Sequence, residues 1–175
     1  MKKISHFNIQ ELLKVDEAVK VSEELINNYF KLSSSQWLKN RYDIKTAKDL
    51  AGHEYIDGPF AQVIKYEARK KDVSLGSSSF SFYKVCLQDG TILSTIARID
   101  KLSLEPFLLY ILTHELIHIV RFVKFKQRYE NRNEAEVTLD EERRVHFLTH
   151  EILKSVPILR LDQVFEFYKD WIPVG

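Results

Sequence analysis

The sequence THELIHI at residues 113–119 carries the pattern H-E-x-x-H inside a long apolar segment. If this segment is helical, His114 and His118 lie one turn apart and project from the same face. Glu115 projects beside this pair. Two histidines at this spacing can hold a zinc ion, and a carboxylate next to them can accept a proton from zinc-bound water. The pattern predicts a metal site with His114 and His118 as ligands and Glu115 as the catalytic base.

The apolar surroundings favour this interpretation. Residues 104–125 are largely apolar, yet three ionisable side chains interrupt them between His114 and His118. Burying such groups without partners is costly. A bound metal removes that cost, because neutral imidazole and ionised carboxylate are the forms that it binds. The alternatives are a buried histidine pair that is satisfied by hydrogen bonds, or a chance match.

Composition places the chain among ordinary soluble globular proteins. Its 175 residues suit a single domain, and a formal net charge of +1 gives no general attraction to nucleic acid or to anionic membranes. Cys86 is the only cysteine, which excludes a disulfide framework and cysteine-based zinc sites. The N-terminus lacks the apolar run of a signal peptide, and the apolar run before His114 is too short to span a bilayer. We therefore expect a cytoplasmic protein with no nucleic-acid or membrane partner.

Hydrophobic periodicity predicts a mainly helical chain. Capping residues and prolines set the expected helix ends. Ser103 is a suitable N-cap for the helix that carries the motif, and Pro59 is well placed to open an earlier helix. The predicted helices cover residues 8–31, 59–71, 104–127, 138–156 and 160–171.

The β-strand signal is confined to residues 79–99. Residues 79–87 alternate in polarity, Asp89-Gly90 is typical of a two-residue hairpin turn, and residues 91–99 are rich in β-branched side chains. We therefore expect an α+β fold, mainly helical with one small antiparallel β-sheet. The expected single domain, 1–175, has an N-terminal helical segment at 1–35, a metal-site core at 59–156 and a C-terminal helix at 157–175.

A catalytic zinc site usually takes three protein ligands and one water, so a third ligand has to come from elsewhere in the chain. Glu142, His146 and His150 recur every four residues and share one face of the predicted helix that follows the motif. Glu141 stands at the third position after Thr138, where its side chain is expected to cap the helix. We therefore predict Glu142 as the third ligand. His146 is expected to hydrogen-bond a ligand or to be a fourth ligand.

The motif His114-Glu115-Leu116-Ile117-His118, followed by a glutamate on a downstream helix, resembles the zincin metallopeptidases, and among them the gluzincin branch. The segment Glu142-Arg143-Arg144-Val145-His146 is similar to the E-x-x-x-D pattern of that branch, with His146 in place of the usual aspartate. The resemblance covers residues 104–155.

This resemblance implies a zincin-like architecture and activity. A backing helix, a small sheet, the motif helix and the glutamate helix would correspond to residues 59–71, 79–99, 104–127 and 138–156. The implied function is zinc-dependent hydrolysis of peptide bonds in a peptide or protein substrate. An edge strand of the sheet can hold such a substrate by main-chain hydrogen bonds.

In such an enzyme His114, His118 and Glu142 hold zinc. Glu115 takes a proton from the bound water and delivers it to the leaving amine. A further electrophile is expected to stabilise the oxyanion. The candidates are His146, His150, Tyr110 and Tyr129, and the sequence leaves this choice open.

Two other functions stay open. Glu142, His146 and His150 facing His114 and His118 would offer five ligands, which suits a non-proteolytic protein that binds iron, manganese or another transition metal. A complete di-iron carboxylate bundle needs two Glu-x-x-His motifs, and the motif helix supplies one. The third possibility is an inactive zincin-like interaction module.

Overall fold

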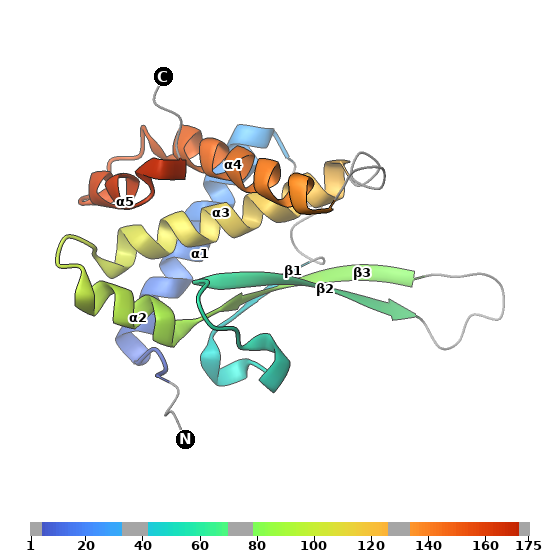
Figure 1. Cartoon of the computed structure of the whole chain (residues 1–175), viewed down its shortest axis with the longest axis horizontal. Coiled ribbons are helices and arrows are strands. Elements are labelled where there is room, and N and C mark those ends of the chain that lie inside the picture. Colours follow the sequence, from blue (N-terminus) through green and yellow to red (C-terminus); the bar gives the residue numbers. More distant parts are fainter. Residues whose placement is uncertain (1–4, 33–41, 70–78, 126–133, 172–175) are drawn as a thin grey trace.

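The computed structural model describes residues 5–32, 42–69, 79–125 and 134–171 (Figure 1). Its helices are α1 (Ile9–Phe30), α2 (Asp89–Arg98), α3 (Leu104–Phe125), α4 (Glu134–Leu153) and α5 (Leu161–Phe167), and its strands are β1 (Tyr42–Lys45), β2 (Ala61–Arg69) and β3 (Ser79–Leu87). Short 3-10 turns are η1 (Ala47–Asp49), η2 (Gly52–Glu54) and η4 (Lys169–Trp171). The expected α+β class, mainly helical with one small sheet, is confirmed.

The sheet is mixed rather than antiparallel. Its strand order is β1-β3-β2, with β3 parallel to β1 and antiparallel to β2. The β-hairpin is therefore formed by β2 and β3, and not by residues 79–99. Val85 of the central strand pairs with Ile44 on one side and with Val63 on the other.

The predicted helix at 59–71 is wrong, because residues 61–69 form β2. This segment contains β-branched and aromatic residues (Val63, Ile64, Tyr66) that suit a strand, and its pairing with β3 extends from Ala61 opposite Leu87 to the far end of the strand. Such long-range pairing outweighs a weak local preference for helix. Ala61 thereby faces the core.

The predicted second strand at 91–99 is also wrong, because residues 89–98 form α2. Ile92 and Thr95 are buried one turn apart, which is helical spacing. Asp89 is the first residue of this helix rather than part of a hairpin turn. Its buried carboxylate accepts hydrogen bonds from the backbone N–H groups of Phe7 (2.8 Å) and Ala47 (2.9 Å), so contacts that are distant in sequence fix the conformation here.

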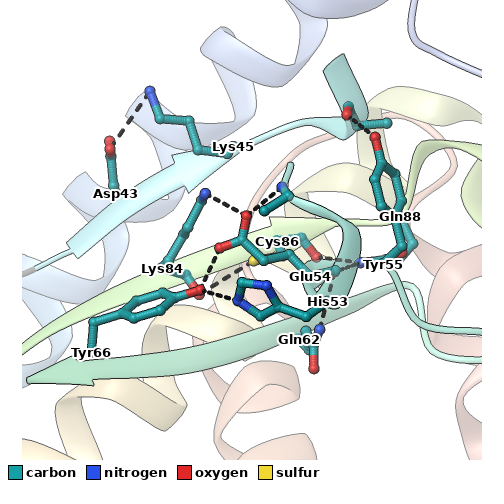
Figure 2. A network of polar contacts seen from close by, with 12 residues as sticks. Asp43, Lys45, His53, Glu54, Tyr55, Gln62, Tyr66, Lys84, Cys86 and Gln88 are labelled. Carbon is teal, nitrogen blue, oxygen red and sulfur yellow. Dashed lines mark hydrogen bonds and ion pairs between the residues drawn. The ribbon is translucent and has the colours of Figure 1, made fainter. Parts of the chain in front are cut away.

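The two faces of the sheet have different neighbours. Tyr83, Val85 and Leu87 are buried on the face toward the helices, and the Tyr83 ring stacks on Phe122 of α3. The opposite face carries Lys84 and is covered by the segment around η2 (Figures 1 and 2). The metal-site motif therefore lies on the helical side of the sheet.

The motif helix α3 runs through the centre of the protein (Figure 1). Most of its apolar side chains are fully buried, among them Phe107, Leu108, Leu112, Leu116, Ile117 and Ile119. Within the described residues, α3 is the one helix that is long and apolar enough to cross a membrane, over Leu104–Val123, but 72% of its most apolar window is buried inside the protein. This burial indicates that α3 is a core helix, although its length and composition would also allow it to cross a membrane.

The remaining helices agree in place with the sequence and differ at their ends. A capping box between Asn8 and Glu11 opens α1, and α5 with η4 occupies the predicted C-terminal helix. The helix expected at 138–156 begins at Glu134 and ends at Leu153. Glu141 therefore lies inside α4, and the predicted capping box is wrong.

Candidate metal centre

The side chains of His114, His118 and Glu142 converge between α3 and α4. The Nε2 atoms of the two histidines lie 3.1 Å apart. The Glu142 carboxylate places Oε1 2.7 Å from His118 Nε2 and Oε2 3.3 Å from His114 Nε2. Donor atoms on one tetrahedral zinc ion, at ordinary metal–ligand distances, lie about 3.3 Å from each other. The three donors therefore have the identity and the spacing of ligands to a single zinc ion.

His146 stands beside this triad. Its Nε2 atom lies 3.6 Å from Glu142 Oε2, and the candidate donor atoms of His114, Glu142 and His146 all lie within 4.8 Å of one another. Its Nδ1 atom is 2.8 Å from the hydroxyl of Tyr110. The indole of Trp171 stacks on the imidazole, with ring centroids 4.9 Å apart. The hydrogen bond with Tyr110 at Nδ1 and the stacking of Trp171 thus orient the His146 ring with Nε2 toward the triad.

A cleft of about 530 Å³ opens onto this cluster. One wall is the start of β2 with the residues before it, 59–63, and the opposite wall comes from α3 and α4. Glu115 lines the cleft with the triad and His146. The apolar side chains that complete the lining include Phe60, Ile111 and Phe122. The predicted ligands and the predicted base are therefore gathered at one accessible site.

The electrostatics of the triad follow from its close contacts. Burial by itself raises the pKa of Glu142, but the hydrogen bonds and charges of His114 and His118 outweigh burial and lower that pKa below its ordinary range. Burial likewise disfavours charge on His118, but the hydrogen bond that its ring donates to Glu142 and the charge of Glu115 outweigh burial and raise the pKa of His118. Glu142 is therefore ionised, which is the form that binds a metal.

Two neighbours of the triad are shifted toward their neutral forms. Burial raises the pKa of Glu115, against the lowering effect of the two motif histidines. Burial, and after it the charge of His114, lower the pKa of His146 to about 3. His146 is therefore a neutral imidazole near pH 7, and Glu115 is a stronger base than an exposed glutamate.

Glu141 also lines the cleft, but its carboxylate pairs with Arg121 of α3. The guanidinium donates from Nε to Oε1 (2.5 Å) and from a terminal nitrogen to Oε2 (3.1 Å). This two-point contact joins α3 and α4 about one turn of α3 after His118. The sequence did not predict it. The only signal was an arginine that follows His118 at nearly one helical turn.

The other candidates take different places. His150 packs its ring against Phe165, with centroids 4.5 Å apart, and is not among the described residues that line the cleft. The five-ligand arrangement is therefore not assembled. Tyr110 lies behind His146 rather than in the cleft, and Tyr129 falls outside the described residues. The contribution of Trp171 was missed, because nothing in the sequence connects the C-terminal segment with the motif.

Comparisons of this chain with protein-family models, with curated proteins and with solved structures found no match. The zincin resemblance therefore stays a prediction that rests on residues 104–155. The function has to be inferred from the geometry of the site itself.

Proposed function

We propose that this protein is a zinc-dependent metallopeptidase of reduced gluzincin type that acts in the cytoplasm. The observation that carries the proposal is the convergence of His114, His118 and Glu142 at donor spacing on the wall of a cleft. A zinc ion bound there would polarise the scissile carbonyl and acidify its bound water. Iron or manganese is the alternative metal for the same donors.

Glu115 is the general base of this proposal. It follows the first ligand on α3, lines the cleft, and has a pKa raised by burial. A carboxylate whose pKa approaches the working pH both accepts a proton from water and returns it to a leaving amine efficiently. Glu115 therefore lies beside the proposed ligands and binds a proton more tightly than an exposed glutamate, which supports this role.

The substrate in this proposal is a peptide in extended conformation. β2 stands at one edge of the sheet, and residues 59–63, which include its first residues, border the cleft. A peptide lying along this edge would form main-chain hydrogen bonds with β2 while its carbonyl faces the metal cluster. This placement supports a peptide or a protein loop over a small molecule.

The decisive variant is Glu115→Gln, with Glu105→Gln as the matched control on the same helix. Glu105 is exposed and lies in the first turn of α3. Elemental analysis and cleavage of a mixed library of internally quenched peptides are measured together. We expect both variants to hold one zinc per chain, and turnover to fall at least about 100-fold in Glu115→Gln alone. Undiminished cleavage by Glu115→Gln, or a wild-type protein without zinc, contradicts the proposal.

A second candidate function is metal binding without catalysis. The observation that favours it is the proximity of His146 to His114 and Glu142, because a fourth protein ligand would leave no open position for water. Near-stoichiometric metal in wild-type protein that is lost in His146→Ala, without any cleavage, would support this function. An empty site after reconstitution would favour an inactive interaction module.

A further inference from the structure

We infer that His146 presents a Nε2–H donor to the cleft, where it hydrogen-bonds the substrate carbonyl instead of binding the metal, and that Tyr110 is the positioning residue that fixes this tautomer. The role toward substrate rests on the proposed function. The tautomer rests on contacts of described residues alone, so the two can fail separately.

The proton of the Tyr110 hydroxyl needs an acceptor inside the protein. Tyr110 is fully buried, and a phenol with an ordinary pKa of about 10 keeps its proton near neutral pH. Its hydroxyl lies 2.8 Å from His146 Nδ1, and the described residues offer it no other hydrogen-bond partner. If the imidazole donated in this contact, the phenol proton would be buried without an acceptor, which is strongly unfavourable. The Tyr110 hydroxyl is therefore the donor and Nδ1 the acceptor.

A neutral imidazole carries a single N–H, so a ring that accepts at Nδ1 must carry its proton at Nε2. An imidazolium carries an N–H at both nitrogens and can accept at neither, so the ring that accepts from Tyr110 at Nδ1 is the neutral form. A protonated nitrogen has no lone pair for a metal. The tautomer thus separates His146 from His114 and His118, although all three lie in one cluster.

His146 Nε2 lies 3.6 Å from Glu142 Oε2, which is beyond hydrogen-bond distance. The residue lines the cleft beside the triad, where negative charge would develop on a carbonyl oxygen under attack. The Nε2–H group is therefore placed to receive that oxygen.

Aromatic stacking and the hydrogen bond from Tyr110 orient the His146 ring in advance. Trp171 stacks on the His146 imidazole at an interplanar angle of 28°, and Tyr168 stacks on Tyr110 with centroids 4.1 Å apart. These contacts fix both members of the Tyr110–His146 pair from the C-terminal segment. A donor that is already oriented needs no rearrangement in the transition state, which is the condition for a large catalytic effect.

The test combines zinc content, imidazole ¹⁵N NMR and kinetics on zinc-treated full-length protein. The variants are Tyr110→Phe, His146→Ala and His146→Gln, and the control is His150→Ala on the same helix. We expect all four to hold as much zinc as wild type. In wild type, the spectrum of ¹⁵N-histidine should show His146 protonated at Nε2, with Nδ1 as the acceptor, and Tyr110→Phe should shift the ring toward the other tautomer.

In the kinetic arm, kcat should fall about 100-fold in His146→Ala with little change in KM, and the side-chain amide of His146→Gln should restore part of it. Loss of zinc in His146→Ala, with zinc kept in His150→Ala, overturns the inference and makes His146 a ligand. A proton on Nδ1 in wild type overturns it as well. If wild type cleaves no peptide, the metallopeptidase proposal fails, while zinc content and the NMR spectrum still decide between donor and ligand.

Discussion

His118 Nε2 and Glu142 Oε1 lie 2.7 Å apart, although they belong to two successive helices, α3 and α4. One turn along, the Arg121–Glu141 pair joins the same two helices through two hydrogen bonds. Adjacent residues of a helix point about 100° apart, so Glu141 and Glu142 cannot both face the histidines. Because Glu141 is paired with Arg121, Glu142 is the glutamate that contacts His114 and His118.

The two adjacent glutamates should have opposite effects when each is replaced. Glu142→Gln removes a charged donor from the triad, so we expect zinc affinity to fall about 10-fold to 100-fold or more. Glu141→Gln keeps the triad and should hold zinc at the wild-type level. Competition with a chromophoric chelator measures both affinities. Equal losses in the two variants would contradict the assignment of Glu142 as the ligand.

Arg121→Met should destabilise the protein without emptying the metal site. Its side chain and that of Glu141 are largely buried, at 16% and 12% exposure, so Arg121→Met removes two hydrogen bonds from a partly desolvated carboxylate. We expect the free energy of unfolding to fall by about 2 kcal/mol. Urea unfolding measures this, with the exposed Arg143→Met as the control. A variant as stable as the control would show that this pair does not hold α3 and α4 together.

Asp89→Ala should be among the most destabilising single changes outside the site. Its buried carboxylate accepts two backbone hydrogen bonds, from Phe7 and Ala47, which tie the N-terminal segment and η1 to α2. Both N–H groups would lose their acceptor, so we expect a loss of about 3 kcal/mol in thermal or urea unfolding. Exposed Asp100→Ala is the control and should change stability little. A loss no larger than that of the control would mean that water replaces the carboxylate without cost.

Glu54 should contribute a pH-dependent part of the stability. Figure 2 shows its buried carboxylate accepting hydrogen bonds from Lys84 Nζ (2.7 Å) and the Tyr66 hydroxyl (2.6 Å). The Lys84 ammonium, followed by the Tyr66 hydroxyl, lowers the pKa of Glu54 to about 2. Because the folded pKa lies below the unfolded one, this contribution is fully present above the ordinary glutamate pKa and is lost as the pH falls toward 2.

The comparison that isolates this contribution is wild type against Glu54→Gln. The difference in free energy of unfolding between the two should be constant from pH 7 to pH 5 and should shrink between pH 4.5 and pH 2. Urea unfolding at several pH values measures it, and exposed Glu67→Gln serves as the control. A difference that stays constant down to pH 3 would show that Glu54 has an ordinary pKa in the folded protein.

The sequence by itself determined the features that depend on local geometry. The spacing of His114 and His118 places them on one face because every α-helix has the same periodicity, and the apolar surroundings of the motif are sufficient to predict a core helix. The four-residue spacing from Glu142 to His146 likewise predicts a shared face. The class of fold and the candidate ligands therefore followed from patterns within single helices.

Tertiary structure decided everything that depends on partners far apart in the chain. Residues 61–69 form a strand because β3 lies beside them, and residues 89–98 form a helix whose first carboxylate, Asp89, is held by two distant backbone segments. The sequence predicted Glu142 as the ligand because Glu141 was expected to cap the helix. In the structure Glu141 instead pairs with Arg121, and this pairing orients α4 so that Glu142 contacts the histidines. Local propensities differ by less than about 1 kcal/mol per residue, so strand pairing and burial override them, and neither can be read from a single segment.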